Sequence, residues 1–225
     1  INKAETHKWK YGIPPTGNAN YAWLQHFVSK LAPFGTAGIV LANGSMSSEI
    51  ATEGDIRKAM IEADLVDCMV ALPSQLFYNT QIPACLWFLA RNKTETTKFR
   101  NRTNEVLFID ARELGTMISR KQRELTDEDI EHVSEIYHKW RSKEYETEYN
   151  DVAGLCKSAS IQDIRKNNYI LTPGRYIDFK EVEEDGEAFN EKMQMLTAKL
   201  SQQMQKANDL DETIKQNLAK IGYEL

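Results

Sequence analysis

Two apolar runs that lie close together in the chain place the strongest constraint on its fold. Residues 65–72 and 82–90 each have the length of a buried strand, and the segment between them opens with Pro73 and is polar and aromatic. Neighbouring parallel strands need a crossover of about a dozen or more residues, usually a helix. The two runs are therefore predicted to pair as antiparallel strands of one sheet.

Strand-sized runs alternate with helical patterns through the rest of the first two thirds of the chain. Residues 37–42 are continuously apolar and are followed by Asn43 and Gly44, which predicts a central strand covered on both faces. Another short strand is expected at 106–110. Helices are expected after Asn18 or Asn20 and at 53–63, 126–140 and 161–168, with Thr126 and Asp129 forming a capping box. This order predicts an α/β fold with a mixed sheet and helices on both sides.

The last forty or so residues have the pattern of one long amphipathic helix. Apolar residues recur there at intervals of three and four, with Gln, Lys, Asp and Glu between them: Phe189, Met193, Leu196, Leu200, Met204, Ala207, Leu210, Ile214, Leu218 and Ile221. Such a stripe needs an apolar partner.

Charge and cysteine content limit which partners and which cellular compartment fit the protein. The net charge of −5 and the pI near 5.5 exclude an overall positive field that would attract nucleic acid, so any DNA contact must be local or shared. Three separated cysteines in apolar surroundings indicate buried thiols in a reducing compartment. No apolar run reaches the roughly 18 residues of a membrane span. We therefore expect a cytoplasmic protein without a metal or a membrane anchor.

Motifs of self-sufficient catalysis are missing from the 225 residues. The sequence has no G-x-G-x-x-G, no phosphate-binding loop, no G-x-S-x-G around Ser45 and no H-E-x-x-H. The acidic cluster at 127–129 opens a helix, where carboxylates complement the helix dipole. His26, His132 and His138 form no coherent cluster. The residues themselves therefore indicate no complete active site.

Several strings, in one order, resemble a single protein family. They are YGIPP at 11–15, GNANYAWLQH at 17–26, GIVLANGSM at 38–46, LPSQLFYNT at 72–80, IPACLWFL at 82–89, LFIDAR at 107–112 and LTPGRY at 171–176. Over residues 9–177 the chain resembles the modification (M) subunits of type I restriction-modification systems. The terminal helix resembles the family only as an appended helix.

The resemblance implies an adenine-N6 DNA methyltransferase that uses S-adenosylmethionine. Two family motifs do not occur in the chain: the glycine-containing cofactor loop and the Asn-Pro-Pro-Phe/Tyr tetrapeptide, since Pro14-Pro15 lacks both flanking residues. We therefore expect a C-terminal piece that is inactive alone, with no catalytic or cofactor-binding residue. Its expected fold is the distal half of a Rossmann-like methyltransferase sheet with an antiparallel hairpin, plus the long terminal helix.

The resemblance also suggests where DNA is contacted. In amino-methyltransferases the loop into the last strand helps to line the target-base pocket, so Phe77 is the candidate for base stacking, against simple packing beneath the loop. The other pocket candidates are Tyr78, Asn79, Thr80, Asn18 and Asn20. A local basic segment supplies the candidates for contact with the DNA backbone, although such a run is more commonly a solvated connector: Arg91, Lys93, Lys98, Arg100 and Arg102. Arg120, Lys121 and Arg123 form a similar basic run.

The family assembles two M subunits with one specificity (S) subunit and with restriction (R) subunits on DNA. We expect residues 1–150 to belong to the catalytic domain, 151–186 to be an extension and linker, and 187–225 to be a helical tail that binds the S subunit. Folding back of this tail on its own domain, or pairing with itself, is the alternative. Separately, we expect a tendency to self-associate through the sheet edge that is left exposed where the first strands should pair. A non-catalytic assembly module is the second interpretation, and a small-molecule or RNA methyltransferase is the third. The DNA site recognised is not encoded here.

Overall fold

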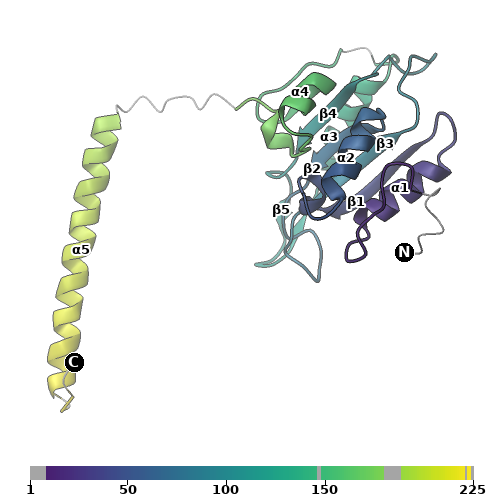
Figure 1. Ribbon diagram of the computed structural model, residues 1–225. Helices are drawn as coiled ribbons and strands as arrows, with labels where there is room; N and C mark the ends of the chain where they lie inside the picture. Colours follow the sequence, from purple (N-terminus) through teal and green to yellow (C-terminus); the bar gives the residue numbers. More distant parts are fainter. Residues whose placement is uncertain (1–8, 146–147, 180–188, 221, 224–225) are drawn as a thin grey trace. The chain divides into compact units, whose positions relative to one another are not determined.

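The computed structural model describes residues 9–145, 148–179, 189–220 and 222–223. The chain divides into two compact units, Ile1–Lys180 and Glu181–Leu225, of which the first holds the sheet (Figure 1). The boundary expected at residue 150 does not separate structural units, because strand β7 (Cys156–Ser160) pairs with β4 in the main sheet. This polar strand, Cys-Lys-Ser-Ala-Ser, was not predicted because it has no apolar run.

The main sheet has five strands in the order β1-β3-β2-β4-β7. Their bounds are β1 Thr36–Ala42, β2 Val66–Ala71, β3 Ala84–Ala90, β4 Glu105–Asp110 and β7 Cys156–Ser160. Strand β3 is antiparallel to β2, with Met69 opposite Trp87 and Ala71 opposite Cys85, as the short connection predicted. Strands β2 and β4 are parallel, so the predicted mixed sheet is confirmed.

Strand β1 was predicted to be central and covered on both faces, and the structure corrects this. It lies at the edge of the sheet and pairs only with β3 among the described strands. Its exposure alternates along the strand: Ile39 packs against the core while Val40 is 53% exposed. The error arose because small and apolar residues at 37–42 occupy both faces, so the sequence lacks the polar alternation that marks a half-covered strand.

Helices cover both faces of the sheet, as predicted. On one face α1 (Asn20–Lys30), α2 (Glu53–Glu62) and α4 (Ile161–Lys166) contribute Leu24, Met60 and Ile164 to a core that contains Trp87 of β3. On the other face α3 (Asp127–Arg141) brings Trp140 against Leu107 of β4. Strand β2 contributes to both cores and is buried along its whole length.

A local capping signal accounts for where α3 begins, but not for where α1 begins. Thr126 Oγ1 accepts a hydrogen bond from Asp129 N (3.1 Å), and Asp129 Oδ2 accepts one from Thr126 N (2.9 Å), which confirms the predicted capping box of α3. Before α1, Asn18 Oδ1 accepts a hydrogen bond from Asn20 N (3.0 Å). The N-cap of α1 is, however, Ala19, and no side chain caps this helix, so the expectation that Asn18 or Asn20 caps it was wrong.

The second unit contains helix α5, Phe189–Lys220, where the amphipathic pattern predicted a helix. Its large apolar side chains are about half exposed or more: Met193, Met195, Leu196, Leu200, Met204, Leu210 and Ile214. The helix therefore carries apolar surface along its length. No helix in the described part of the chain is both long and apolar enough to cross a membrane.

The three cysteines are buried as free thiols, which confirms that prediction. Burial raises the pKa of the thiols of Cys68, Cys85 and Cys156. The Cys85 thiol also contacts Ser45 Oγ at 3.5 Å inside the core. All three are therefore core residues held in the unreactive, protonated form.

An ion pair between α2 and α4 gives a prediction for the pH dependence of stability. Glu62 accepts hydrogen bonds from Arg165 (2.8 and 2.6 Å) and Tyr169 (2.7 Å), which together lower its pKa from 4.5 to about 2. A lowered folded-state pKa stabilises the protein above the unfolded value, and the stabilisation is lost as the pH falls toward 2. Glu62→Gln should therefore destabilise the chain at pH 7, and this difference should shrink between pH 4.5 and pH 2.

Urea unfolding at a series of pH values measures this difference. Glu131→Gln is the matched control, since Glu131 is exposed on α3 and forms no ion pair with another described residue. Its effect should be small and should not follow the same pH window. A Glu62→Gln difference that stays constant from pH 7 to pH 2 would show that the pair with Arg165 does not stabilise the fold.

Candidate functional site

The ends of three strands converge at one end of the sheet. Because β3 is antiparallel to both β1 and β2, and β2 is parallel to β4, strands β1, β2 and β4 all run in the same direction. We call the side where these three end the carboxyl end of the sheet, and the side where they begin the amino end. Open α/β sheets bind ligands outside the carboxyl ends of their strands. The carboxyl end is therefore the first place to look for a site.

The loop that follows β2 presents two aromatic side chains at this end. Pro73 ends the strand, and the chain makes a tight turn in which Thr80 N donates to Phe77 O at 3.4 Å. Thr80 Oγ1 then accepts from Ile82 N at 3.1 Å. Phe77 is 43% exposed and Tyr78 is 91% exposed, and Asn79 and Thr80 are exposed beside them. The turn therefore projects the predicted pocket residues into solvent.

A small second sheet braces that loop from the other side. Strands β5 (Thr116–Met117) and β6 (Arg123–Glu124) pair antiparallel after β4. Arg123 N donates to Gln75 O at 2.9 Å, and Gln122 Nε2 donates to Leu76 O at 3.0 Å. We call residues 116–124 the ribbon. It was not predicted because its paired segments are only two residues long.

One residue of the sequence could have indicated the ribbon: the glycine at its base. Gly115 has φ +82°, and a Cβ there would lie 2.7 Å from the Glu124 carbonyl oxygen. Arg123 closes the same corner, since its guanidinium donates to Leu114 O at 2.8 Å. A glycine followed by a short polar segment is consistent with this turn.

Asn18 and Asn20 lie near the same end of the sheet. Tyr21, at the start of α1, donates its hydroxyl hydrogen to Ser45 O at 2.6 Å, and Ser45 follows the carboxyl end of β1. Burial raises the pKa of Tyr21 to about 12, so this donor keeps its proton. Both asparagines are half-buried, and the side-chain oxygen of Asn18 already accepts a hydrogen bond from Asn20 N. Their role at a target-base pocket stays a prediction.

The basic segment 91–102 lies at the amino end of the sheet, opposite the aromatic loop, because it follows the end of β3. The structure corrects the expectation for two of its residues. Lys93 is 2% exposed, and its Nζ donates to Val66 O (2.9 Å) and Glu105 O (2.7 Å). Arg102, also 2% exposed, pairs with Asp67 at 3.1 Å. The two cations are buried and already paired, Lys93 with Asp64 and backbone carbonyls and Arg102 with the buried Asp67, so neither can contact a phosphate.

The other three basic residues of the segment reach the surface. Arg100 is half-buried, pairs with Glu105 at 2.8 Å and stacks over Trp140 at 4.9 Å. Lys98 is exposed, and Arg91 is exposed with its guanidinium donating to Leu31 O. Their possible contact with DNA backbone stays a prediction, at the end of the sheet away from Phe77.

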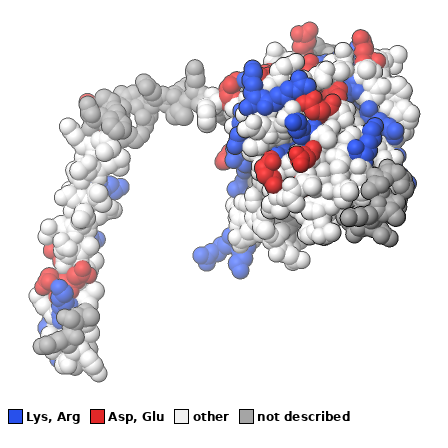
Figure 2. All heavy atoms as spheres, in the orientation of Figure 1, with Lys and Arg blue, Asp and Glu red and all other residues white. Residues whose placement is uncertain are grey.

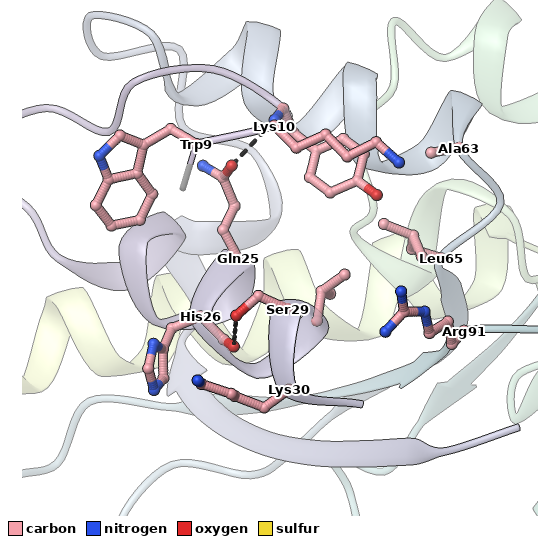
Figure 3. Close-up of a pocket in the computed structure, with 11 residues that line it drawn as sticks. Trp9, Lys10, Gln25, His26, Ser29, Lys30, Ala63, Leu65 and Arg91 are labelled. Atoms are coloured by element: carbon pink, nitrogen blue, oxygen red, sulfur yellow. Dashed lines mark hydrogen bonds between the residues drawn. The ribbon is translucent and has the colours of Figure 1, made fainter. Parts of the chain in front are cut away.

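Arg91 also lines a pocket of ≈ 650 Å³ at the amino end (Figure 3). Figure 3 shows that its wall includes Trp9, Gln25, His26 and Lys30, with Gln25 Oε1 accepting from Tyr11 N at 3.1 Å. His26 is exposed at its rim. The pocket contains none of the predicted base-pocket residues.

The described residues at the carboxyl end do not fit S-adenosylmethionine by themselves. Strand β1 is followed by a 3-10 helix, Asn43–Met46, in which Ser45 turns inward to accept a hydrogen bond from Trp87 Nε1 at 3.0 Å. Asn43 Oδ1 is buried and has no described partner. A single unpaired acceptor, without a glycine-rich loop beside it, is not sufficient to form a cofactor site.

Comparisons with known proteins show the family to which the chain belongs. The family model described as N-6 DNA Methylase matches residues 1–185. The type I restriction enzyme HindI methylase subunit of Haemophilus influenzae is 52% identical over 221 residues, which is 98% of this chain and 48% of that protein. The chain belongs to the N-6 DNA methylase family.

Two further proteins extend the comparison. The type I restriction enzyme MjaIX methylase subunit of Methanocaldococcus jannaschii is 42% identical over 95% of this chain and 37% of its own length. The crystal structure of a type I restriction-modification methyltransferase subunit from Streptococcus thermophilus aligns with a TM-score of 0.63 and 31% identity, covering 75% of this chain and 32% of that one. The chain spans about half the length of the HindI relative and less of the others.

Proposed function

We propose that this chain forms part of a type I modification subunit that transfers a methyl group from S-adenosylmethionine to N6 of adenine in DNA. The observation that carries the proposal is the aromatic loop at the carboxyl end of the sheet, where Phe77 and Tyr78 are exposed in a member of this family. The fold would be the distal half of a Rossmann-like methyltransferase sheet. In that arrangement the exposed edge of β1 would meet the remaining strands.

The chemistry of adenine explains why an exposed aromatic loop fits this role. The N6 lone pair is delocalised into the purine ring, so the base must be held in a defined position before it can attack a methyl group. Enzymes that act on a base extrude it from the duplex and stack it between aromatic or apolar side chains. Phe77 is half-exposed at the turn that would meet such a base, with Asn79 and Thr80 beside it for polar contacts.

The transfer itself would need groups outside these 225 residues. The sequence contains neither the Asn-Pro-Pro-aromatic tetrapeptide, whose acceptors would hold the amino group, nor a glycine-rich cofactor loop. The chain alone should therefore give no heat in a calorimetric titration with S-adenosylmethionine. A chimera in which this chain replaces the matching segment of the HindI subunit should bind it. Binding by the chain alone would place the cofactor site elsewhere.

Phe77→Ala in that chimera tests the stacking role. Stacking on an aromatic side chain contributes about 1–3 kcal/mol per base. Methyl transfer to DNA should therefore fall by roughly 5- to 150-fold, while the melting temperature stays unchanged. Phe34→Ala is the matched control, because Phe34 is 66% exposed just before the start of β1, at the amino end of the sheet, so its loss should have a small effect. A Phe77→Ala chimera that is unstable but fully active would show that Phe77 only packs beneath the loop.

Helix α5 supports a second, compatible role in assembly. Its apolar residues are exposed along the helix, which is the property of a surface that packs on another helix. We infer that residues 187–225 bind the helices of the S subunit within a complex that also holds a second M subunit, R subunits and DNA. If the chain has only this role, the chimera will assemble without methylating DNA.

A further inference from the structure

The ribbon at residues 116–124 is an ordered projection beside the aromatic loop. Its strands pair Thr116 with Glu124 and Met117 with Arg123. At the tip, Ile118 N donates to Gln122 O at 3.0 Å, and Ser119 Oγ accepts from Gln122 N at 3.1 Å. The backbone of the tip is therefore a closed turn.

Cations and apolar groups are combined at this tip. Arg120 and Lys121 are exposed and form no ion pair with another described residue. Met117 is 46% exposed and Ile118 is 56% exposed beside them. The acidic Glu124 lies at the base, opposite Thr116. Figure 2 shows Lys and Arg atoms on a projection at the lower margin of the folded unit, where the ribbon lies in Figure 1.

The position of the ribbon links it to the proposed base pocket. The hydrogen bonds from Arg123 N to Gln75 O and from Gln122 Nε2 to Leu76 O hold it against the residues that immediately precede Phe77. Both elements follow strands that end at the carboxyl end of the sheet. A group bound at the ribbon tip is therefore on the same side of the molecule as a base stacked on Phe77.

We propose that the ribbon tip binds the phosphate backbone of duplex DNA next to the target base, with Arg120 and Lys121 each neutralising a phosphate. This inference rests on the proposed function. An acidic chain with a net charge of −5 needs a local cationic contact to hold DNA. Extruding a base also requires that the DNA backbone on either side of it be held. Exposed apolar residues such as Ile118 can contact the bases that become unstacked when the target base leaves the helix.

The same placement identifies which basic segment serves DNA. Residues 91–102 lie at the amino end of the sheet, and Lys93 and Arg102 are buried there in ion pairs. Arg112, near the ribbon, is held by Asp110 at 2.6 Å. Arg120 and Lys121 are thus exposed cations on the same side as Phe77, and they lie next to the aromatic loop.

Fluorescence anisotropy with a labelled DNA duplex tests the inference on the 225-residue chain. The double variant Arg120→Gln, Lys121→Gln should bind about tenfold or more weakly at 50 mM salt, and the slope of log affinity against log salt should fall by about 1.8, or 0.9 per lost contact. The matched control Lys10→Gln, Lys30→Gln removes two exposed cations beside the pocket at the amino end and should change neither quantity. Equal melting temperatures show that both variants fold.

Three outcomes would overturn the inference. The first is an unchanged affinity and salt slope for the ribbon variant, and the second is an equal effect of the control variant. In both cases DNA binding and the proposed function stand. The third is that the wild-type chain binds polyglutamate but no duplex at 20 mM salt, which would assign the tip to an acidic protein partner. Methyl transfer by the chimera then decides separately whether the proposed function stands.

Discussion

Replacing Arg102 with methionine should lower the free energy of unfolding by about 3–5 kcal/mol, because it leaves the Asp67 carboxylate buried without its cation. Asp67 is fully buried in β2, where Arg102 Nε donates to one carboxylate oxygen at 3.1 Å and the Tyr137 hydroxyl donates to the other at 2.7 Å. The guanidinium also lies 5.6 Å from the Trp140 ring. Removing it therefore disturbs the core between the sheet and α3.

Urea unfolding followed by circular dichroism measures this loss. Adding Asp67→Asn to the Arg102→Met variant should recover part of it, since the uncompensated charge is then removed. Lys143→Met is the control, because Lys143 pairs with Glu95 at the surface and such pairs contribute about 1 kcal/mol or less. A loss below about 1 kcal/mol for Arg102→Met would show that the buried pair does not support the fold.

Charge placed on the apolar stripe of α5 should strongly weaken assembly with the S subunit. Leu200 and Met204 are 56% and 62% exposed and lie one helical turn apart. Each would lose about 1.5–3 kcal/mol of apolar burial in an interface, so Leu200→Glu, Met204→Glu should weaken binding by at least about 100-fold. Biolayer interferometry against immobilised S subunit measures this.

A second pair of substitutions distinguishes damage to the apolar stripe from a general effect of added negative charge on the helix. Gln202→Glu, Gln205→Glu adds the same two charges on the opposite face of the helix and should bind like the wild type. If both double variants bind equally well, or if a chain lacking residues 187–225 still forms the full complex, α5 has another partner. Self-pairing of the helix would appear as a concentration-dependent mass in light scattering.

The parts of the fold that followed from the sequence are those set by length and local chemistry. The connection between 65–72 and 82–90 was too short for a crossover, so antiparallel pairing was determined before any tertiary contact was known. The capping box at Thr126 and Asp129 likewise needs only neighbouring residues. The order of strands does not depend on such local terms, and β1 was therefore misplaced at the centre of the sheet.

The features that could not be predicted from the sequence depend on contacts between residues that are far apart in the chain. Lys93 and Arg102 belong to a basic segment with the composition of a solvated connector, and only the fold places Asp64 and Asp67 against them. The ribbon has too few paired residues to give an alternating pattern, yet its backbone contacts to Gln75 and Leu76 place it at the candidate site. Phe77 was identified through the family resemblance, and its exposure agrees with the proposed role.

Methyl transfer by the chimera of this chain with the HindI subunit tests the central claim most directly. The protein would be assembled with an S subunit and incubated with duplex DNA and labelled S-adenosylmethionine, and the nucleosides would be analysed by mass spectrometry. We predict that N6-methyladenine forms at a rate comparable to that of the parent HindI subunit. A folded chimera that binds both the cofactor and the S subunit, but forms no N6-methyladenine while the parent does, would contradict the proposed function.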